Sequence, residues 1–201
     1  MGFVSTYWAS VSSNLAGLGR FRGRQTRISF WPYAATVGVL SAVAAQAILI
    51  PELRDTMERM RAFAEAHPDQ ASIATTAHGT SISIRGLHPE LMPDLGSLAL
   101  PMAVLLAVTV ALLAAAVVRR LHDAGRSAAW GVPPVILLVA GVMLMARLFA
   151  LDAMDWRLFV GALLTNALYL ASLLALIVML AREGVPPPLP AMAPANGRVG
   201  A

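Results

Sequence analysis

Residues 98–118 read LALPMAVLLAVTVALLAAAVV and carry no charged side chain on any face. A helix needs about 20 apolar residues to cross about 30 Å of hydrocarbon, and this stretch has that length. Backbone groups cannot stay unpaired in lipid, so the stretch is predicted to be a transmembrane helix. The alternative is a buried helix of a soluble bundle, whose outer helices would need polar faces.

Three further apolar stretches flank this one, at about 30–50, 130–148 and 159–181. Of the 201 residues, 58% are hydrophobic and 13% are charged, which is about half the charge of a typical soluble domain. The predicted fold is therefore an all-α polytopic membrane protein with a bundle of four transmembrane helices, spanning residues 30–182. The chain has no cysteine, which excludes disulfides, thiolate metal sites and cysteine nucleophiles.

The charges between these stretches predict an orientation. Four arginines and no acid precede the first helix, and three arginines with one acid lie between the second and third. The loop at about 51–97 instead has four arginines and seven acids. Because basic residues stay on the cytoplasmic side, we expect both termini in the cytoplasm and the 51–97 loop outside.

The segments outside the spans have predicted structures of their own. Within residues 1–29, an arginine cluster follows an apolar stripe at helical spacing, which predicts an amphipathic helix on the inner leaflet; a frayed tail is the alternative. In the 51–97 loop, we expect a helical extension as far as His67 and then a hairpin within 72–85, turning at His78-Gly79. The proline-rich segment 183–201 is predicted to be a disordered cytoplasmic tail. The apolar stripe of the N-terminal segment comprises Val4, Trp8, Val11, Leu15 and Leu18.

The loop between the second and third helices reads RRLHDAGRS over residues 119–127. Much of it suits a tight turn, because Gly125 can adopt the left-handed conformation and Ser127 can cap the next helix. The adjacent His122 and Asp123 fit that explanation least. A helix dipole disfavours a carboxylate at its C-terminus, so we expect Asp123 to accept hydrogen bonds from an arginine of the N-terminal cluster, either Arg24 or Arg27.

Two motifs carry a family resemblance. The pattern G-R-x-x-R-x-x-F-W runs from Gly23 to Trp31, and R-R-L-H-D-x-G-R-S fills residues 119–127. Together they resemble the bacterial inner-membrane family called domain of unknown function 805, over roughly residues 15–182. The chain differs in its longer first external loop and in Ala128-Ala129, where the family more often has Gly-Trp. The resemblance implies the topology and an inner-membrane location, but no activity.

These observations favour a non-enzymatic membrane protein that binds anionic lipid headgroups or a protein partner, with a homo-oligomer left open. A small transporter or channel subunit is one alternative, in which a polar stripe on the fourth helix lines a path, although helix packing explains that stripe better. A membrane enzyme that uses His122 and Asp123 is another. We expect no cofactor, metal site or nucleic-acid partner. The predicted binding residues are Arg24, Arg27, Arg119, Arg120 and Arg126, and the stripe comprises Thr165, Tyr169 and Ser172.

Overall fold

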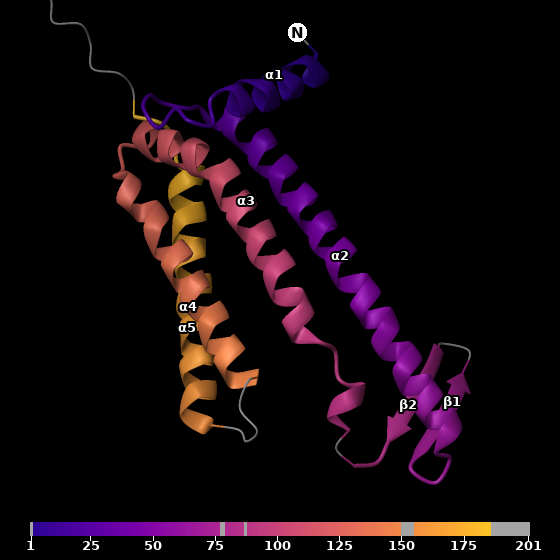
Figure 1. The fold of residues 1–201 in the computed structure, drawn as a ribbon. Helices are drawn as coiled ribbons and strands as arrows, with labels where there is room; N and C mark the ends of the chain where they lie inside the picture. The colour runs from indigo at the N-terminus through magenta and orange to yellow at the C-terminus, as the bar shows by residue number, and fades with distance from the viewer. Residues whose placement is uncertain (1, 77–78, 87, 150–154, 186–201) are drawn as a thin grey trace, which may run out of the picture. The chain divides into compact units, whose positions relative to one another are not determined.

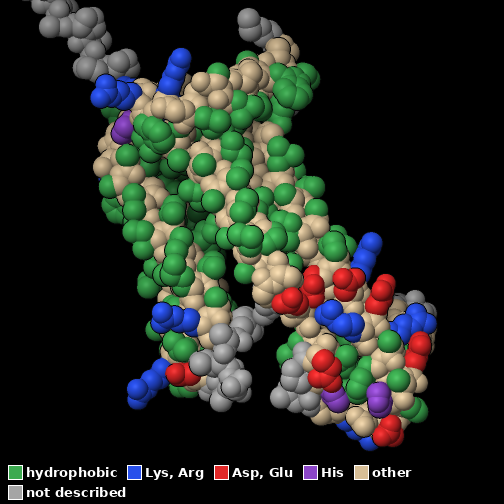
Figure 2. Space-filling view, in the orientation of Figure 1, with side chains coloured by type: hydrophobic (Ala, Val, Ile, Leu, Met, Phe, Trp, Pro, Cys, Tyr) green, Lys and Arg blue, Asp and Glu red, His purple; other side chains and the backbone are tan. Residues whose placement is uncertain are grey.

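The computed structural model describes residues 2–76, 79–86, 88–149 and 155–185. Within these ranges the chain is an all-α protein with four helices long and apolar enough to cross a membrane, which confirms the predicted class. The helices are α1 (Phe3–Ala16), α2 (Arg27–Ala66), α3 (Leu95–Asp123), α4 (Val132–Phe149) and α5 (Trp156–Ala181) (Figure 1). Hydrophobic side chains cover most of the length of the long helices, and charged side chains gather toward their ends (Figure 2).

The chain divides into two compact units, which are described separately. The first unit contains residues up to 18 and residues 31–114. Its helices α2 and α3 are joined by two polar contacts inside their apolar surfaces. The hydroxyl of Tyr33 donates to the carbonyl of Leu112 at 2.8 Å, and the hydroxyls of Ser41 and Thr109 lie 2.8 Å apart. Each contact satisfies a polar group that lipid could not.

Helix α1 confirms the predicted N-terminal helix, and its polar face is the buried one. Ser10 and Asn14 are 3% and 2% exposed, and the Asn14 amide donates to the Ser10 carbonyl. Trp8 and Leu15 of the apolar stripe are 63% and 47% exposed, whereas Val11 is buried. The exposed apolar face is the arrangement expected of a helix that lies against lipid.

The helical extension and the hairpin predicted for the 51–97 loop are both present. Helix α2 continues through Pro51 to Ala66, and the antiparallel strands β1 (Ala71–Thr76) and β2 (Gly79–Ile84) follow. The predicted turn at His78 lies outside the described residues, as does most of the predicted tail. The short helix η1 (Pro89–Leu91) then leads back to α3.

The return to α3 is held to the extension of α2 by one carboxylate. Glu52 accepts from the backbone N–H of Asp94 at 2.8 Å and from the guanidinium of Arg59 at 3.3 Å. Arg59 also donates to the carbonyl of Met92 at 3.2 Å. These bonds fix where the loop ends.

The second unit contains residues 19–30 and the chain from residue 115 onward. The 3₁₀ helix η2 (Ala128–Gly131) leads into α4, and α4 packs along α5 (Figure 1). Thr165 of the predicted polar stripe lies on the face of α5 toward α4, where a Cβ added to Gly141 would meet its methyl group at 3.8 Å. The stripe therefore does face a neighbouring helix at this point.

Candidate functional site

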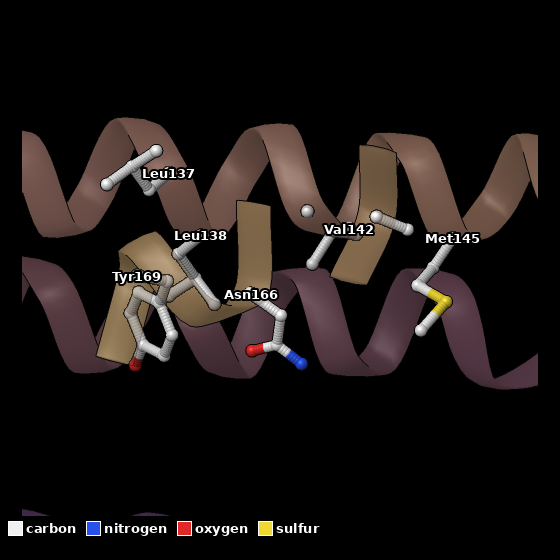
Figure 3. Close-up of a pocket in the computed structure, with 8 residues that line it drawn as sticks. Leu137, Leu138, Val142, Met145, Asn166 and Tyr169 are labelled. Carbon is white, nitrogen blue, oxygen red and sulfur yellow. The ribbon is translucent and has the colours of Figure 1, made fainter. Parts of the chain in front are cut away.

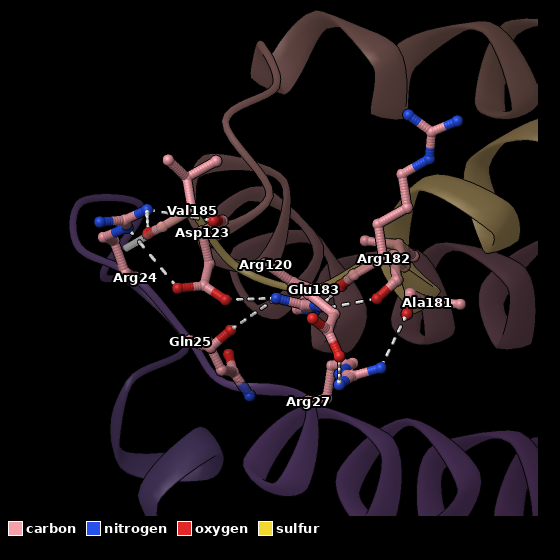
Figure 4. Close-up of polar contacts among 10 residues, drawn as sticks. Arg24, Gln25, Arg27, Arg120, Asp123, Ala181, Arg182, Glu183 and Val185 are labelled. Atoms are coloured by element: carbon pink, nitrogen blue, oxygen red, sulfur yellow. Dashed lines mark hydrogen bonds and ion pairs between the residues drawn. The ribbon is translucent and has the colours of Figure 1, made fainter. Parts of the chain in front are cut away.

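The second unit brings three segments together at one end, which we call the arginine-rich end: residues 19–30, the end of α3 with the turn to η2 (115–131), and residues 180–185. Its centre is Arg120, whose side chain is fully buried. The Nε atom of Arg120 donates to the carbonyl of Leu180 at 2.9 Å, and Nη2 donates to the carbonyl of Arg182 (Figure 4). The last carbonyls of a helix have no partner within the helix. Arg120 therefore satisfies the C-terminal end of α5 from the C-terminal end of α3.

The same guanidinium also holds Asp123. Its Nη1 atom donates to the Asp123 carboxylate and lies 3.5 Å from the carbonyl of Gln25. The Asp123 side chain is 15% exposed, and Arg120 supplies a cationic partner for this largely buried carboxylate. The partner lies one turn earlier in the same helix, and the sequence analysis missed it.

The second partner of Asp123 is Arg24, one of the two arginines that the sequence predicted. Its Nε atom lies 3.6 Å from Oδ1, which is an ion pair rather than the expected hydrogen bond to the carboxylate. Its hydrogen bonds go to the main chain, to the carbonyls of Asp123 at 3.1 Å and of Val185. The N–H of Val185 in turn donates to the Asp123 carbonyl at 2.8 Å, so residues 19–30 and 180–185 meet at the end of α3.

Arg27, the other arginine that the prediction named as a possible partner, makes no hydrogen bond or ion pair to Asp123 among the described residues. Its Nη2 atom lies 3.0 Å from the carboxylate of Glu183, and Nη1 donates to the carbonyl of Ala181 at 3.4 Å. The side chains of Arg27 and Glu183 are 46% and 85% exposed. An ion pair that is open to solvent in this way contributes little, on the order of 0–1 kcal/mol.

Gln25 is a further member of the arginine-rich end that was not predicted from the sequence, although it lies inside the first motif. It is 7% exposed, and its Oε1 atom accepts from Nε of Arg119 at 3.3 Å. Arg119 also donates to the carbonyl of Arg20 at 2.6 Å. The buried Nε2 atom of Gln25 has no hydrogen-bond partner among the described residues. The amide therefore keeps one donor unused beside several arginines.

Two glycines allow the segments to approach this closely. Gly125 has a φ of 67°, as the left-handed prediction requires, and a Cβ there would lie 2.9 Å from Val185. A Cβ on Gly184 would lie 2.5 Å from Oδ2 of Asp123. Ser127 caps the start of η2 by accepting from the N–H of Ala129 at 3.2 Å. The prediction had Ser127 cap the third long helix, which is α4, but η2 precedes α4 in the chain.

The side chains of His122 and Asp123 have different surroundings. The imidazole of His122 is exposed and, within the part of the chain that the structure describes, makes no hydrogen bond or ion pair, whereas the carboxylate of Asp123 is held by arginines. The cavity between α4 and α5 and the cavity between α1, α2 and α3 are both lined by other residues. Across the described ranges, no group of three or more histidine, aspartate or glutamate side chains is placed to hold a metal ion.

The structure brings four of the five predicted arginines together and leaves Arg126 exposed on the adjoining turn. Arg120 is the correction within that set. With its side chain buried and its donors engaged, Arg120 has no surface to offer a headgroup. Its part is to hold the arginine-rich end together.

Comparison with known proteins agrees with this organisation. Neither a curated protein nor a solved structure matches the chain. The sequence model of a family described as "Protein of unknown function (DUF805)" matches residues 18–189, a range that holds both arginine motifs and the four long helices. The chain therefore belongs to the DUF805 family.

Proposed function

We propose that this protein binds anionic lipid headgroups through the exposed arginines of the arginine-rich end, on the cytoplasmic face of a bacterial inner membrane. The observation that carries the proposal is an unbalanced charge. The three segments of that end contain eight arginines and two acids. Both acids are engaged by arginines, Asp123 by Arg120 and Glu183 by Arg27. Eight arginines less two acids leave an excess of six positive charges, which anionic lipid headgroups would complement.

Two arginines are best placed to meet that partner. Arg22 and Arg126 are exposed, and neither guanidinium makes an ion pair or hydrogen bond to another described residue. Both flank the apolar part of a long helix, at the depth where lipid phosphates lie. Trp31 and Trp130, which are 38% and 48% exposed, lie close in sequence to the same helix ends, as interfacial aromatic residues do.

The pair of Arg27 and Glu183 supplies a second place for a phosphate. Since this ion pair is solvent-exposed, a lipid phosphate can replace the carboxylate of Glu183 at little cost. A phosphate offers several acceptor oxygens and suits the forked donors of arginine. The unused Nε2 donor of Gln25 adds a group that an anion could engage after a small rearrangement.

Helix α1 fits the same proposal independently. Its exposed face carries Val4, Trp8 and Leu15, and its polar residues Ser10 and Asn14 are buried within the protein. A helix with this distribution is stable on a leaflet surface, with the apolar side chains among the acyl chains. We infer that α1 lies on the surface of the cytoplasmic leaflet, as its apolar stripe predicts.

The alternative functions have less support. A transport path needs a continuous polar cavity, and the two described cavities are lined mainly by apolar side chains. An enzyme would need a pocket beside His122, and His122 is an exposed side chain that lines neither cavity.

Native mass spectrometry of the protein extracted with its lipids tests the proposal. The Arg22→Gln/Arg126→Gln variant should retain fewer anionic lipids than the unaltered protein, with each arginine weakening lipid binding by about 1 kcal/mol. The matched control is Arg54→Gln/Arg85→Gln, which removes the same charge from exposed positions of the 51–97 loop. Equal retention by all three proteins would contradict the proposal.

A further inference from the structure

The uncharged polar side chain of Asn166 lies near the middle of α5 and has no hydrogen-bond partner among the described residues. Asn166 is ten residues after Trp156 and fifteen before Ala181, the two ends of the helix. At 1.5 Å per residue these separations are about 15 Å and about 22 Å, so Asn166 lies near the centre of a span about 30 Å thick. Its side chain is exposed, and within the described ranges its amide makes no hydrogen bond. An amide left unpaired in hydrocarbon is costly.

The amide opens onto an apolar groove. Figure 3 shows Asn166 and Tyr169 of α5 beside Leu138, Val142 and Met145 of α4. These side chains line a cavity of about 270 Å³. Small residues, including Gly141, also line this groove. A groove with such residues lets another helix approach closely.

The exposed face of α5 next to the amide has the spacing of a helix–helix contact. Leu163, Leu170 and Ile177 follow one another at seven-residue intervals, and Asn166 lies three residues after the first. These three apolar side chains are 58%, 59% and 41% exposed. A seven-residue apolar repeat keeps one face turned toward a partner helix, and a single asparagine in it fixes the register.

We propose that a second copy of this chain packs on this face, so that the two α5 helices run parallel and their Asn166 side chains hydrogen-bond to each other. Two copies inserted in the same orientation are related by a two-fold axis along the membrane normal, which places equal positions at equal depth. An amide both donates and accepts, so it is complementary to its own copy. Acyl chains, the other occupant at that depth, offer no polar group.

Disulfide cross-linking tests the proposal cleanly, because the chain has no cysteine of its own. Leu163→Cys and Leu170→Cys place single thiols on the face that carries Asn166. Leu168→Cys is the matched control: its side chain is 59% exposed, as that of Leu170 is, but it lies about 200° around the helix from Asn166. On oxidation in native membranes, the first two variants should form covalent dimers and the third should not.

The amide itself is tested in the Leu170→Cys background. Adding Asn166→Leu should reduce the cross-linked fraction and raise the dissociation constant in lipid vesicles about fivefold, whereas Asn166→Gln should retain the dimer. Amounts of each variant in the membrane fraction control for insertion. Cross-linking equal at positions 168 and 170 would overturn the proposal, as would no cross-linking at either. Absence of a dimer at both 163 and 170 would overturn it too, and lipid or another part of the chain would then be what covers the groove.

Discussion

Arg120 and Asp123 lie one turn apart at the end of α3, and the buried guanidinium of Arg120 donates to the carboxylate of Asp123. The other donors of the same guanidinium satisfy carbonyls of Leu180 and Arg182 at the end of α5. One side chain thus neutralises the acid of the interhelical turn and holds a second helix end. Arg120 is buried and engaged in these contacts, whereas the exposed arginines around it remain available to bind an anionic partner.

Replacing Arg120 should be the most destabilising change at the arginine-rich end. In Arg120→Gln, the carboxylate of Asp123 loses its main cation and two carbonyls lose their donor, at a cost of about 3 kcal/mol or more. The stability of Arg120→Lys should fall between those of the unaltered protein and Arg120→Gln, because an ammonium keeps the charge but lacks the forked donors of a guanidinium. Chemical unfolding in detergent, followed by tryptophan fluorescence, measures the change. Arg126→Gln, at an exposed position, is the control, and equal stability of the two glutamine variants would show that Arg120 is not the structural centre.

Asp123→Asn should destabilise the protein more than the same loss of charge at an exposed pair. The amide would place N–H donors beside the donors of Arg120, in a site where Asp123 is 15% exposed. Glu65→Gln is the control, since Glu65 pairs with Arg61 at 60% exposure and such pairs contribute about 0.5 kcal/mol or less. The free energies of unfolding of the two variants are measured by chemical unfolding in detergent and compared. A larger effect at Glu65 would contradict the network described for Asp123.

Gly184→Ala should loosen the segment after α5. Its Cβ would lie 2.5 Å from Oδ2 of Asp123, so the segment must shift and the contacts of Val185 must weaken, at a cost of about 1–3 kcal/mol. Gly161→Ala is the control within α5, because nothing lies within 4 Å of a Cβ there and alanine favours helix. Thermal unfolding in detergent should therefore shift in opposite directions for the two variants. Shifts in the same direction would mean that the close approach to Asp123 is not a tight constraint.

The orientation predicted from the arginine distribution is tested by labelling single cysteines. Thiols at Arg126→Cys and at Ala195→Cys should react only after the inner face is opened, and a thiol at Thr80→Cys in β2 should react in intact cells. Thr80 and Arg126 are both exposed, so accessibility within the fold is matched. Labelling of all three positions from one side would refute the predicted crossing of the membrane by α3, which lies between Thr80 and Arg126.

Much of the fold could be read from the sequence because hydrocarbon imposes a simple rule. The uncharged run at 98–118 had to be a helix, and the structure extends it at both ends to Leu95–Asp123. The left-handed Gly125 was predictable for a local reason, since the turn needs a positive φ. The same holds for the hairpin strands, whose β-branched residues alternate on either side of a turn.

The inner contacts of the arginine-rich end could not be read in this way. Adjacent helix residues point about 100° apart, so the sequence could not show that Arg120 faces inward while Arg119 stays half-buried. Nor could it show that the carbonyls at the end of α5 meet Arg120, because that depends on packing over some 60 residues of separation. The nearest signal was Gln25, a neutral polar residue between two arginines of a motif.

The central claim, that the exposed arginines bind anionic headgroups, is tested most directly by unfolding temperature in nanodiscs of two compositions. The unaltered protein should unfold at a higher temperature in phosphatidylglycerol than in phosphatidylcholine. The Arg22→Gln/Arg126→Gln variant should lose about 4–8 °C of that gain, while Arg54→Gln/Arg85→Gln should keep it. Unfolding temperatures that do not depend on the lipid, or a gain that survives loss of Arg22 and Arg126, would contradict the account.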